Sequence, residues 1–180
     1  MKTLIVTGTP GTGKTTLSKK LAKRLNYYYL DVNKIISKYK LAEGYDNKRR
    51  TKIVDIKKLN KFLIDEIKTI KKIILNQKFN KKIQLKNKIK NFKGIIIDSH
   101  LSHYLPRKYV DFCIVTKCGI KELNERLKKK KFNRNKIQEN IQAEIFDICY
   151  NEAKERKHKI IDVDTTKVFN INDLIHSLGG

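Results

Sequence analysis

The chain has 180 residues and a mass of 21.1 kDa, which fits one domain and excludes a two-lobed protein kinase or a helicase with tandem motor domains. Its 42 Lys and Arg residues outnumber its 18 Asp and Glu residues, so the net charge is +24 and polyanionic partners such as nucleic acid or nucleotide phosphates are favoured. The alternative source of this charge is a genome of biased base composition, because lysine, isoleucine and asparagine all have AT-rich codons.

The three cysteines, Cys113, Cys118 and Cys149, form no C-x-x-C pair and indicate free thiols in a reducing cytoplasm. His100 and His103 lack the cysteine or carboxylate neighbours of a zinc site, so no structural zinc is expected. The first residues enter an apolar run directly, and no uncharged stretch approaches the roughly 18 residues of a membrane span. We therefore expect a soluble, cytoplasmic protein that does not contact a membrane.

Short apolar runs alternate with amphipathic stretches, which predicts an α/β fold with a five-stranded parallel sheet and helices on both faces. The predicted strands are residues 3–7, 27–32, 94–98, 111–117 and 159–163. The predicted helices, in which apolar residues recur at helical spacing, are residues 14–25, 120–128, 135–157 and 171–178. In the longest helix, an isoleucine stripe is predicted to face the core: Ile137, Ile141, Ile145 and Ile148.

Two segments interrupt this alternation. Residues 37–55 are polar and contain Gly44, whereas residues 57–93 are rich in lysine and carry a net charge of +11. The first half of this lysine-rich segment spaces its apolar residues as an amphipathic helix, and its second half is compatible with a strand or a helix. No linker rich in Pro, Gly or Ser separates these segments, so residues 1–180 are predicted to form a single domain.

Residues 8–15 match the phosphate-loop pattern G-x-x-x-x-G-K-S/T, with a predicted strand before it and a predicted helix after it. Its glycines allow successive backbone N–H groups to surround a β-phosphate at the helix N-terminus. Lys14 is expected to bridge the β- and γ-phosphates, and the Thr15 hydroxyl is expected to ligate Mg²⁺. The sequence therefore predicts a nucleotide-binding site.

A phosphate loop works with an acidic residue at the end of a neighbouring apolar strand. Asp98 closes the run from Gly94 and is predicted to hold Mg²⁺ through water, with Asp162 and Asp164 as weaker alternatives. A GTPase is not expected, because residues 116–119 begin like the guanine-recognition segment N/T-K-x-D but end in Gly119.

Further strings sharpen this prediction. Pro10 within the loop is characteristic of nucleoside monophosphate kinases. Other strings follow in order along the chain: Gly44-Tyr45-Asp46, Asp98-x-His100, Tyr104-Leu105-Pro106, Glu125-Arg126-Leu127 and the run from Asn140 to Phe146. On these residues the chain resembles the archaeal and nuclear adenylate kinase family, which includes the sixth human isoenzyme type and a coilin-interacting nuclear ATPase. The resemblance covers nearly the whole chain except residues 57–93.

The resemblance implies a P-loop NTPase fold of the nucleoside monophosphate kinase type, with a monophosphate-binding arm near residues 31–54 and a small lid near residues 129–139. The expected ATP-binding residues are Gly11, Gly13, Lys14, Thr15, Thr16 and Lys130. The expected catalytic residues are Lys14, Asp98, His100 and Arg126, with Thr15 and Asp98 holding Mg²⁺. Arg126 is expected either to bring positive charge onto the phosphates or to pack on the ATP base.

The chain departs from the family pattern in the lid and in the arm. The lid has Lys130-Lys131-Phe132 where relatives often have Arg-Gly-Tyr, which keeps positive charge but loses the forked guanidinium. The arm has Ser37 where Arg is frequent. Its phosphate-binding cation is therefore expected among Lys38, Arg49 and Arg50.

Two functions follow from the resemblance. One is a Mg²⁺-dependent adenylate kinase that converts ATP and AMP into two ADP. The other is an assembly ATPase of late small-subunit maturation, with ribosomal protein uS11 and rRNA or a pre-ribosomal particle as partners. The family associates His100 with ATP hydrolysis, as the residue that orients water. Comparing ADP formation with and without AMP separates the two functions.

Overall fold

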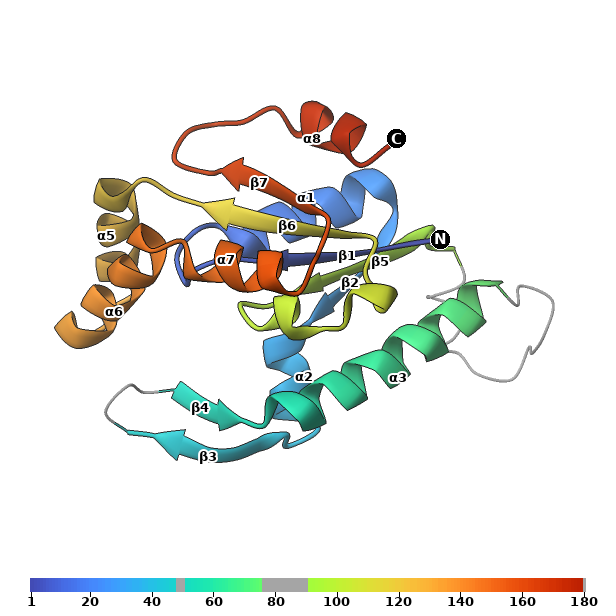
Figure 1. Ribbon diagram of the computed structural model, residues 1–180, viewed down its shortest axis with the longest axis horizontal. Helices are drawn as coiled ribbons and strands as arrows, with labels where there is room; N and C mark the ends of the chain where they lie inside the picture. The colour runs from blue at the N-terminus through green and yellow to red at the C-terminus, as the bar shows by residue number, and fades with distance from the viewer. Residues whose placement is uncertain (48–50, 76–90, 180) are drawn as a thin grey trace.

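The computed structural model describes residues 1–47, 51–75 and 91–179 (Figure 1). Five parallel strands form one sheet in the order β2-β5-β1-β6-β7. These strands are β1 (Lys2–Thr7), β2 (Tyr27–Asp31), β5 (Gly94–Asp98), β6 (Phe112–Lys117) and β7 (Ile160–Asp164). The predicted fold class is confirmed, and each predicted strand agrees with an observed strand to within one residue at either end.

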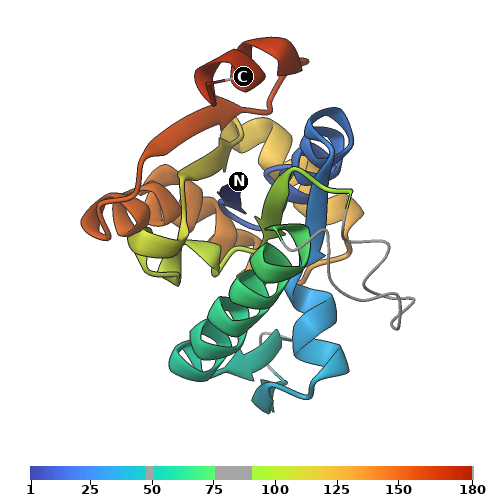
Figure 2. The same cartoon turned by 90° about the vertical axis from the view of Figure 1, so that its right-hand side faces the viewer.

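Helices cover both faces of this sheet. The described helices are α1 (Lys14–Leu25), α2 (Val32–Lys38), α3 (Ile56–Leu75), α5 (Ile120–Lys129), α6 (Arg134–Ile145), α7 (Ile148–Glu155) and α8 (Ile171–Ser177), of which α5 and α6 lie beyond the ends of the strands. Two 3₁₀ turns, η1 (Ser102–Tyr104) and η2 (Arg107–Tyr109), lie between β5 and β6. Figure 2 shows α3 and α8 on opposite sides of the molecule. Among the described residues, no helix is both long enough and apolar enough to cross a membrane.

The alternation of side chains along β1 explains why two separate cores form. Leu4 and Val6 pack with the apolar stripe of α1 and with α8, whereas Ile5 packs with α3 and α2 on the other face. The five residues of β5 are all buried, with Ile95 and Ile97 in one core and Ile96 in the other. A strand buried on both faces reads as a continuous apolar run, which is why Gly94–Asp98 could be predicted from the sequence.

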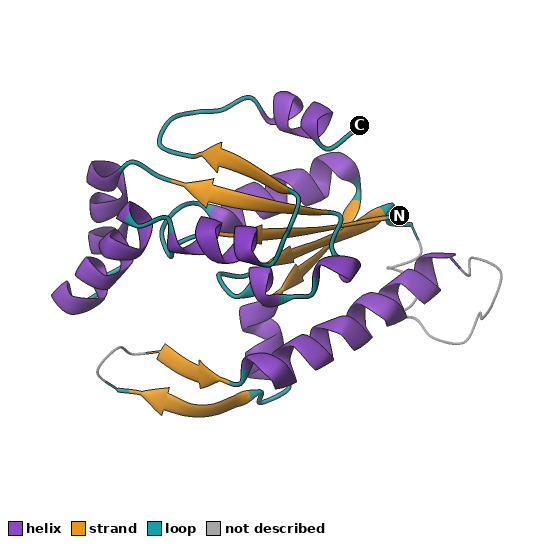
Figure 3. Cartoon of the chain, viewed as in Figure 1, coloured by secondary structure: helices purple, strands orange, loops and turns teal. Residues whose placement is uncertain are grey.

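The β3–β4 hairpin and α3 lie beside the sheet rather than within it. An antiparallel hairpin of β3 (Ala42–Asp46) and β4 (Thr51–Val54) stands apart from the parallel strands (Figure 3). The first half of the lysine-rich segment forms α3, and its buried side chains recur at helical spacing: Leu59, Leu63, Ile67, Ile70 and Ile74. Residues 76–90, which include the ambiguous second half, lie outside the described residues.

The prediction of one helix over residues 135–157 was wrong. The helix breaks at Phe146 and Asp147, and Asp147 adopts a left-handed backbone conformation with φ 50°. Ile145 is 58 % exposed and Ile148 is 42 % exposed, so these two members of the isoleucine stripe do not belong to the core.

Contacts with the end of β6 explain the break. Lys117 Nζ donates to Asp147 Oδ2 over 2.9 Å, and the Cys118 backbone N–H donates to Glu144 Oε1 over 2.7 Å. These bonds hold the chain at the end of α6 against the sheet while α7 leaves in a new direction. Ile137 and Ile141 pack against the small apolar cluster of the lid side, with Leu123 and Leu127.

Candidate active site

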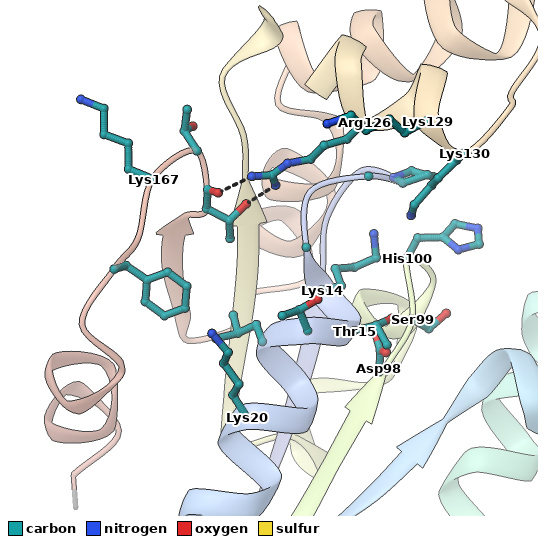
Figure 4. A pocket seen from close by; sticks show the side chains of 18 of the residues that line it. Lys14, Thr15, Lys20, Asp98, Ser99, His100, Arg126, Lys129, Lys130 and Lys167 are labelled. Atoms are coloured by element: carbon teal, nitrogen blue, oxygen red, sulfur yellow. Dashed lines mark hydrogen bonds between the residues drawn. The ribbon is translucent and has the colours of Figure 1, made fainter. Parts of the chain in front are cut away.

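A cavity of about 750 Å³ opens at the carboxyl ends of β1 and β5, where open α/β sheets bind their ligands (Figure 4). Its wall brings together every residue predicted to bind ATP or to take part in catalysis: Gly11, Gly13, Lys14, Thr15, Thr16, Asp98, His100, Arg126 and Lys130. The other lining residues are Pro10, Leu17, Lys20, Asn33, Ser99, Lys129 and residues 165–169 after β7. Cations therefore dominate a cavity whose only lining carboxylate among the described residues is Asp98.

The phosphate loop requires glycine at three positions because their φ angles are positive. They are 137° at Gly8, 99° at Gly11 and 87° at Gly13. A Cβ on Gly8 would lie 2.4 Å from the Thr116 carbonyl oxygen, so a side chain there is excluded by the neighbouring strand. Gly13 is the N-cap of α1 and offers no side-chain hydrogen bond to the first turn. The N–H groups of that turn are thereby available to an anion.

Two threonines from distant parts of the chain support the back of the loop. Thr116 Oγ1 of β6 lies 2.6 Å from Thr12 Oγ1, and Thr165 Oγ1 donates to the Thr12 carbonyl over 2.7 Å. Both contacts join the loop to the ends of β6 and β7. Hydrogen bonds within the protein therefore support the loop on the side away from the cavity.

The Lys14 side chain is hydrogen-bonded to the backbone of the phosphate loop. Its Nζ donates to the Gly8 carbonyl over 2.7 Å and to the Thr9 carbonyl over 2.8 Å. Burial lowers the pKa of Lys14 to about 8, although Asp98 favours the charged form. The Gly8 and Thr9 carbonyl oxygens carry only partial negative charge, whereas the oxygens of a triphosphate carry full negative charges. The position of Lys14 therefore suits it to phosphate binding.

Asp98 is 4 % exposed and accepts a 2.8 Å hydrogen bond from the Tyr29 hydroxyl of β2. Burial and this bond raise the pKa of Tyr29, which keeps the phenol protonated as a donor. Thr15 lies on the same side of the cavity and is exposed. A carboxylate and a hydroxyl are oxygen donors, and they fit a Mg²⁺ ion that keeps several waters and takes phosphate oxygens. Tyr29 was not predicted from the sequence.

His100 projects from the turn after β5 toward the cavity, near Lys14 and Lys130 (Figure 4). Desolvation by the surrounding protein and the charge of Lys14 lower the pKa of His100 to about 4, although part of the residue is exposed. The imidazole is therefore neutral near pH 7. A neutral imidazole can accept a hydrogen bond from water, which a protonated one cannot.

Arg126 is held at the far wall of the cavity by both ends of its guanidinium. Its Nε donates to Glu122 Oε1 over 2.8 Å, one turn earlier in α5. Its Nη2 and Nη1 donate to the carbonyl and hydroxyl oxygens of Thr165, over 2.8 Å and 3.2 Å (Figure 4). These bonds fix the guanidinium beside residues 165–169, on the side of the cavity away from Asp98.

Residues 165–169 and Lys20 were not predicted from the sequence. Thr165 links α5 to the phosphate loop, and Lys167 and Phe169 line the cavity. The available signal was the polar run directly after the last strand, at the same sheet edge as the phosphate loop. Neither Asp162 nor Asp164, the weaker metal candidates, lines the cavity. Asp164 instead accepts hydrogen bonds from the Thr166 hydroxyl and backbone N–H, which lower its pKa.

A phosphate loop after the first strand of a parallel sheet, with an acid at the end of the adjacent strand, defines the P-loop kinase fold. Solved structures agree: deoxyadenosine kinase from M. mycoides with bound dATP superposes with a TM-score of 0.55, at 16 % identity, with both chains fully covered. This likeness concerns the fold alone.

Sequence relatives then identify the family. Residues 4–147 match the family model described as an AAA domain. A "Putative adenylate kinase" of Methanocaldococcus jannaschii is 38 % identical over 174 residues, covering 96 % of this chain and 82 % of the relative. The "Adenylate kinase isoenzyme 6 homolog" of Caenorhabditis elegans is 27 % identical over 152 residues, covering 84 % and 72 %. The chain belongs to this AAA-domain family, together with its archaeal adenylate kinase relatives.

Proposed function

We propose that this protein is an adenylate kinase, which transfers the terminal phosphoryl group of ATP to AMP and yields two ADP. The observation that carries the proposal is the single cavity in which the phosphate loop, Asp98 and a set of cations meet. The names of the archaeal relatives support the same reaction. Three free cysteines fit a reducing compartment, and we place the protein in the cytoplasm.

The reaction needs positioning and charge neutralisation rather than a covalent intermediate. Lys14 would exchange its bonds to the Gly8 and Thr9 carbonyls for oxygens of the β- and γ-phosphates. The N–H groups at the start of α1 would bind the β-phosphate, and Lys130 would close on the phosphates from the lid side. Thr15, together with Asp98 through water, would hold Mg²⁺, which neutralises phosphate charge when bound.

Arg126 supports the base side of the nucleotide in this proposal. Its bonds to Glu122 and Thr165 keep the guanidinium on the wall formed by residues 165–169, where Phe169 supplies an aromatic surface. A planar guanidinium held in this way can stack on a base. Of the two roles expected for Arg126, this one agrees better with the observed contacts.

The arm provides the monophosphate site. Asn33 of α2 lines the cavity, and Lys52 of β4 donates from Nζ to Ser37 Oγ over 2.6 Å. Lys52 therefore brings a cation to the place where relatives often carry the arm arginine. Lys38 contacts the Tyr39 ring, and Arg49 and Arg50 lie outside the described residues.

The test is ADP formation from ATP and Mg²⁺ with and without AMP. We expect AMP to raise the rate of ATP consumption, and we expect two ADP molecules to form for each ATP consumed. Chelation of Mg²⁺ should stop the reaction. Release of inorganic phosphate at the same rate whether or not AMP is present would instead favour a dedicated ATPase.

We infer a second activity, ATP hydrolysis in late maturation of the small ribosomal subunit, with uS11 and rRNA as partners. The neutral His100 imidazole supports the hydrolysis, because it can orient water near the terminal phosphate. Two exposed apolar side chains at the end of α6, Ile145 and Phe146, provide a surface for a protein partner, and the net charge of +24 favours RNA.

Binding measurements test this second activity. Affinity for purified uS11 should fall when Phe146→Ser is introduced, whereas Leu75→Ser, which changes another exposed apolar side chain, should have no effect. Binding to small-subunit rRNA should weaken steeply with salt, by a log–log slope of roughly 0.7 to 0.9 per phosphate contact. Unchanged uS11 affinity in Phe146→Ser would contradict the role of this surface.

A further inference from the structure

A buried polar cluster behind the phosphate loop has no part in the mechanism above. It consists of Thr7, the last residue of β1, with His103 of η1 and Glu152 of α7, and we call it the His103 cluster. Thr7 is fully buried and His103 is 1 % exposed. Buried polar groups are costly unless their hydrogen-bonding capacity is used, so such a cluster requires an explanation.

The two ring nitrogens of His103 have different contacts. Nδ1 lies 2.7 Å from Thr7 Oγ1, at hydrogen-bonding distance. Nε2 lies 2.7 Å from Glu152 Oε2, which makes an electrostatic contact without the alignment of a hydrogen bond. Glu152 Oε1 accepts a 2.9 Å hydrogen bond from the Tyr104 hydroxyl. The His103 carbonyl lies 2.9 Å from His158 Nε2, which donates to it. The Glu152 carboxylate, the His103 ring and the His103 backbone carbonyl thus each have a different contacting neighbour.

The partners of the ring determine its tautomer. Burial lowers the pKa of His103 to about 4, against the effect of Glu152, so the ring is neutral near pH 7. A neutral ring carries one N–H group, and the negative charge of Glu152 beside Nε2 favours that hydrogen on Nε2 rather than on Nδ1. Nδ1 is then an acceptor, and the Thr7 hydroxyl donates to it. Glu152 therefore orients the ring electrostatically, and the ring orients Thr7.

Thr7 lies between the His103 ring and the turn that carries His100. Its Oγ1 is 3.3 Å from the carbonyl oxygen of His100, a residue that lines the cavity. The Thr7 hydroxyl has one hydrogen, which serves His103 Nδ1 in this tautomer, so its contact with the His100 carbonyl is a packing contact and the His103 ring provides the link to the turn. The same turn is joined to β1 at Val6, whose carbonyl accepts from the Ser99 backbone N–H over 3.2 Å and from Ser102 Oγ over 3.1 Å. His100 thus sits at the tip of a turn whose two ends are held by β1 and by the His103 cluster.

We propose that His103 is a positioning residue for His100: Glu152 orients its ring, and the ring and the Thr7 hydroxyl together hold the turn that carries His100. This inference rests on the proposed function, in which His100 orients water. Displacement of a positioned group by about 1 Å can cost a hundredfold in rate, so loss of the cluster should be visible in hydrolysis.

The experiment measures ATP hydrolysis without AMP and ADP formation with AMP, in a double-mutant cycle. His103→Phe and Thr7→Val should each lower hydrolysis by roughly tenfold to a hundredfold, the cost seen for outer-shell partners at metal sites. Transfer to AMP should fall less, because AMP brings its own nucleophile. In the His100→Ala background, neither substitution should lower hydrolysis further by more than about twofold.

Thr3→Val is the matched control. Thr3 lies on the same face of β1, is fully buried like Thr7, and its hydroxyl has no partner among the described residues. It should leave hydrolysis unchanged. His103→Asn, whose side-chain oxygen can replace Nδ1 as the acceptor for Thr7, should restore part of the hydrolysis lost in His103→Phe. If His103→Phe does not fold, the pair Thr7→Val and Thr3→Val decides the question.

The outcomes separate this inference from the proposed function. Absence of both hydrolysis and transfer in the unmodified protein would overturn the proposed function and the role of His103 with it. A different result would overturn this inference alone. In that result the unmodified protein shows both transfer and hydrolysis, but Thr7→Val and His103→Phe lower hydrolysis by the same factor in the His100→Ala background as in the unmodified protein. Equal losses in Thr7→Val and Thr3→Val would also overturn it, because they would reflect packing of β1.

Discussion

The two sides of the cavity differ in how the protein holds them. The phosphate loop follows β1 and Asp98 ends β5, and the residues of both strands are almost entirely buried. Hydrogen bonds from Thr116 of β6 and from Thr165, directly after β7, support the loop. The arm is a hairpin whose central residues are exposed, among them Tyr45 at 55 % and Ile53 at 52 %. Its contact with α3 includes the surface ion pair of Lys58 with Glu43.

This difference indicates which substrate site is prepared in advance. Surface ion pairs contribute about 0–1 kcal/mol, whereas the phosphate loop is joined by hydrogen bonds of Thr12 to Thr116 and Thr165. We infer that the ATP side is preorganised and that the arm takes its final position when the monophosphate binds. Substitutions on the two sides should therefore affect different parameters, and the predictions below test that separation.

The largest effect is expected for Lys14→Met on the ATP side. Turnover should fall by roughly a hundredfold to a thousandfold, equivalent to about 2.7–4 kcal/mol of barrier, because a preorganised charge next to the reacting phosphate is lost. The fold should remain intact. Steady-state kinetics and circular dichroism check the two parts, and turnover within threefold of the unmodified protein would remove Lys14 from the mechanism.

Thermal unfolding of the same variant tests the cost of burying this lysine. The native pKa of Lys14, about 8, lies below the ordinary value of 10.5, so the native state binds fewer protons than the unfolded state between these pH values. The lysine therefore opposes folding at pH 7, and that cost declines as pH rises through this window. Lys14→Met should have an unfolding midpoint equal to or above that of the unmodified protein at pH 7; a clear decrease would contradict the assignment.

His100→Ala should give the next largest effect, in one reaction more than in the other. Hydrolysis without AMP should fall by roughly tenfold to a hundredfold, since a positioned group for water is lost, and transfer to AMP should fall severalfold less. Parallel assays of phosphate release and ADP formation measure the ratio. Equal losses in both reactions would indicate that His100 has a structural role, and His176→Ala, on the exposed side of α8, is the control.

As the pH is raised, the kcat/KM for ATP should fall at a lower pH than any change in the binding of AMP at the arm. The kcat/KM for ATP should fall about tenfold per pH unit above about 8, as Lys14 of the free enzyme loses its proton. At saturating ATP the fall in kcat should begin at higher pH, because bound phosphates stabilise the ammonium. Lys14→Arg should be less active but show no fall near pH 8; the same fall in this variant would assign the titration to another group.

The smallest effect is expected for Ile53→Ser in the hairpin. The KM for AMP should rise a few-fold, while hydrolysis without AMP and the KM for ATP stay unchanged. The free energy of unfolding should change by no more than about 0.5 kcal/mol, as is usual at exposed positions. Leu75→Ser, at an exposed position on α3, should change none of these parameters, and an altered KM for ATP in Ile53→Ser would contradict the separation of the two sides.

The sheet and the phosphate loop could be predicted from the sequence because their signals are local. Gly94–Asp98 reads as a buried strand, and Lys14–Leu25 has an apolar stripe that begins directly after the loop. The pattern G-x-x-x-x-G-K-S/T specifies positive φ angles and a helix start within eight residues. Each of these signals depends on neighbours in the chain, so no knowledge of distant contacts was needed.

Only the tertiary structure decided the features that depend on distant residues. The break between α6 and α7 lies where Lys117, thirty residues earlier, holds the Asp147 carboxylate, and helical periodicity alone continued across the break. Arg126 is held by Thr165, and His103 lies against Glu152, through contacts between elements that the sheet order brings together. Periodicity reports which side of an element is buried, whereas the partner of a buried polar group is set by how strands and helices are arranged in space.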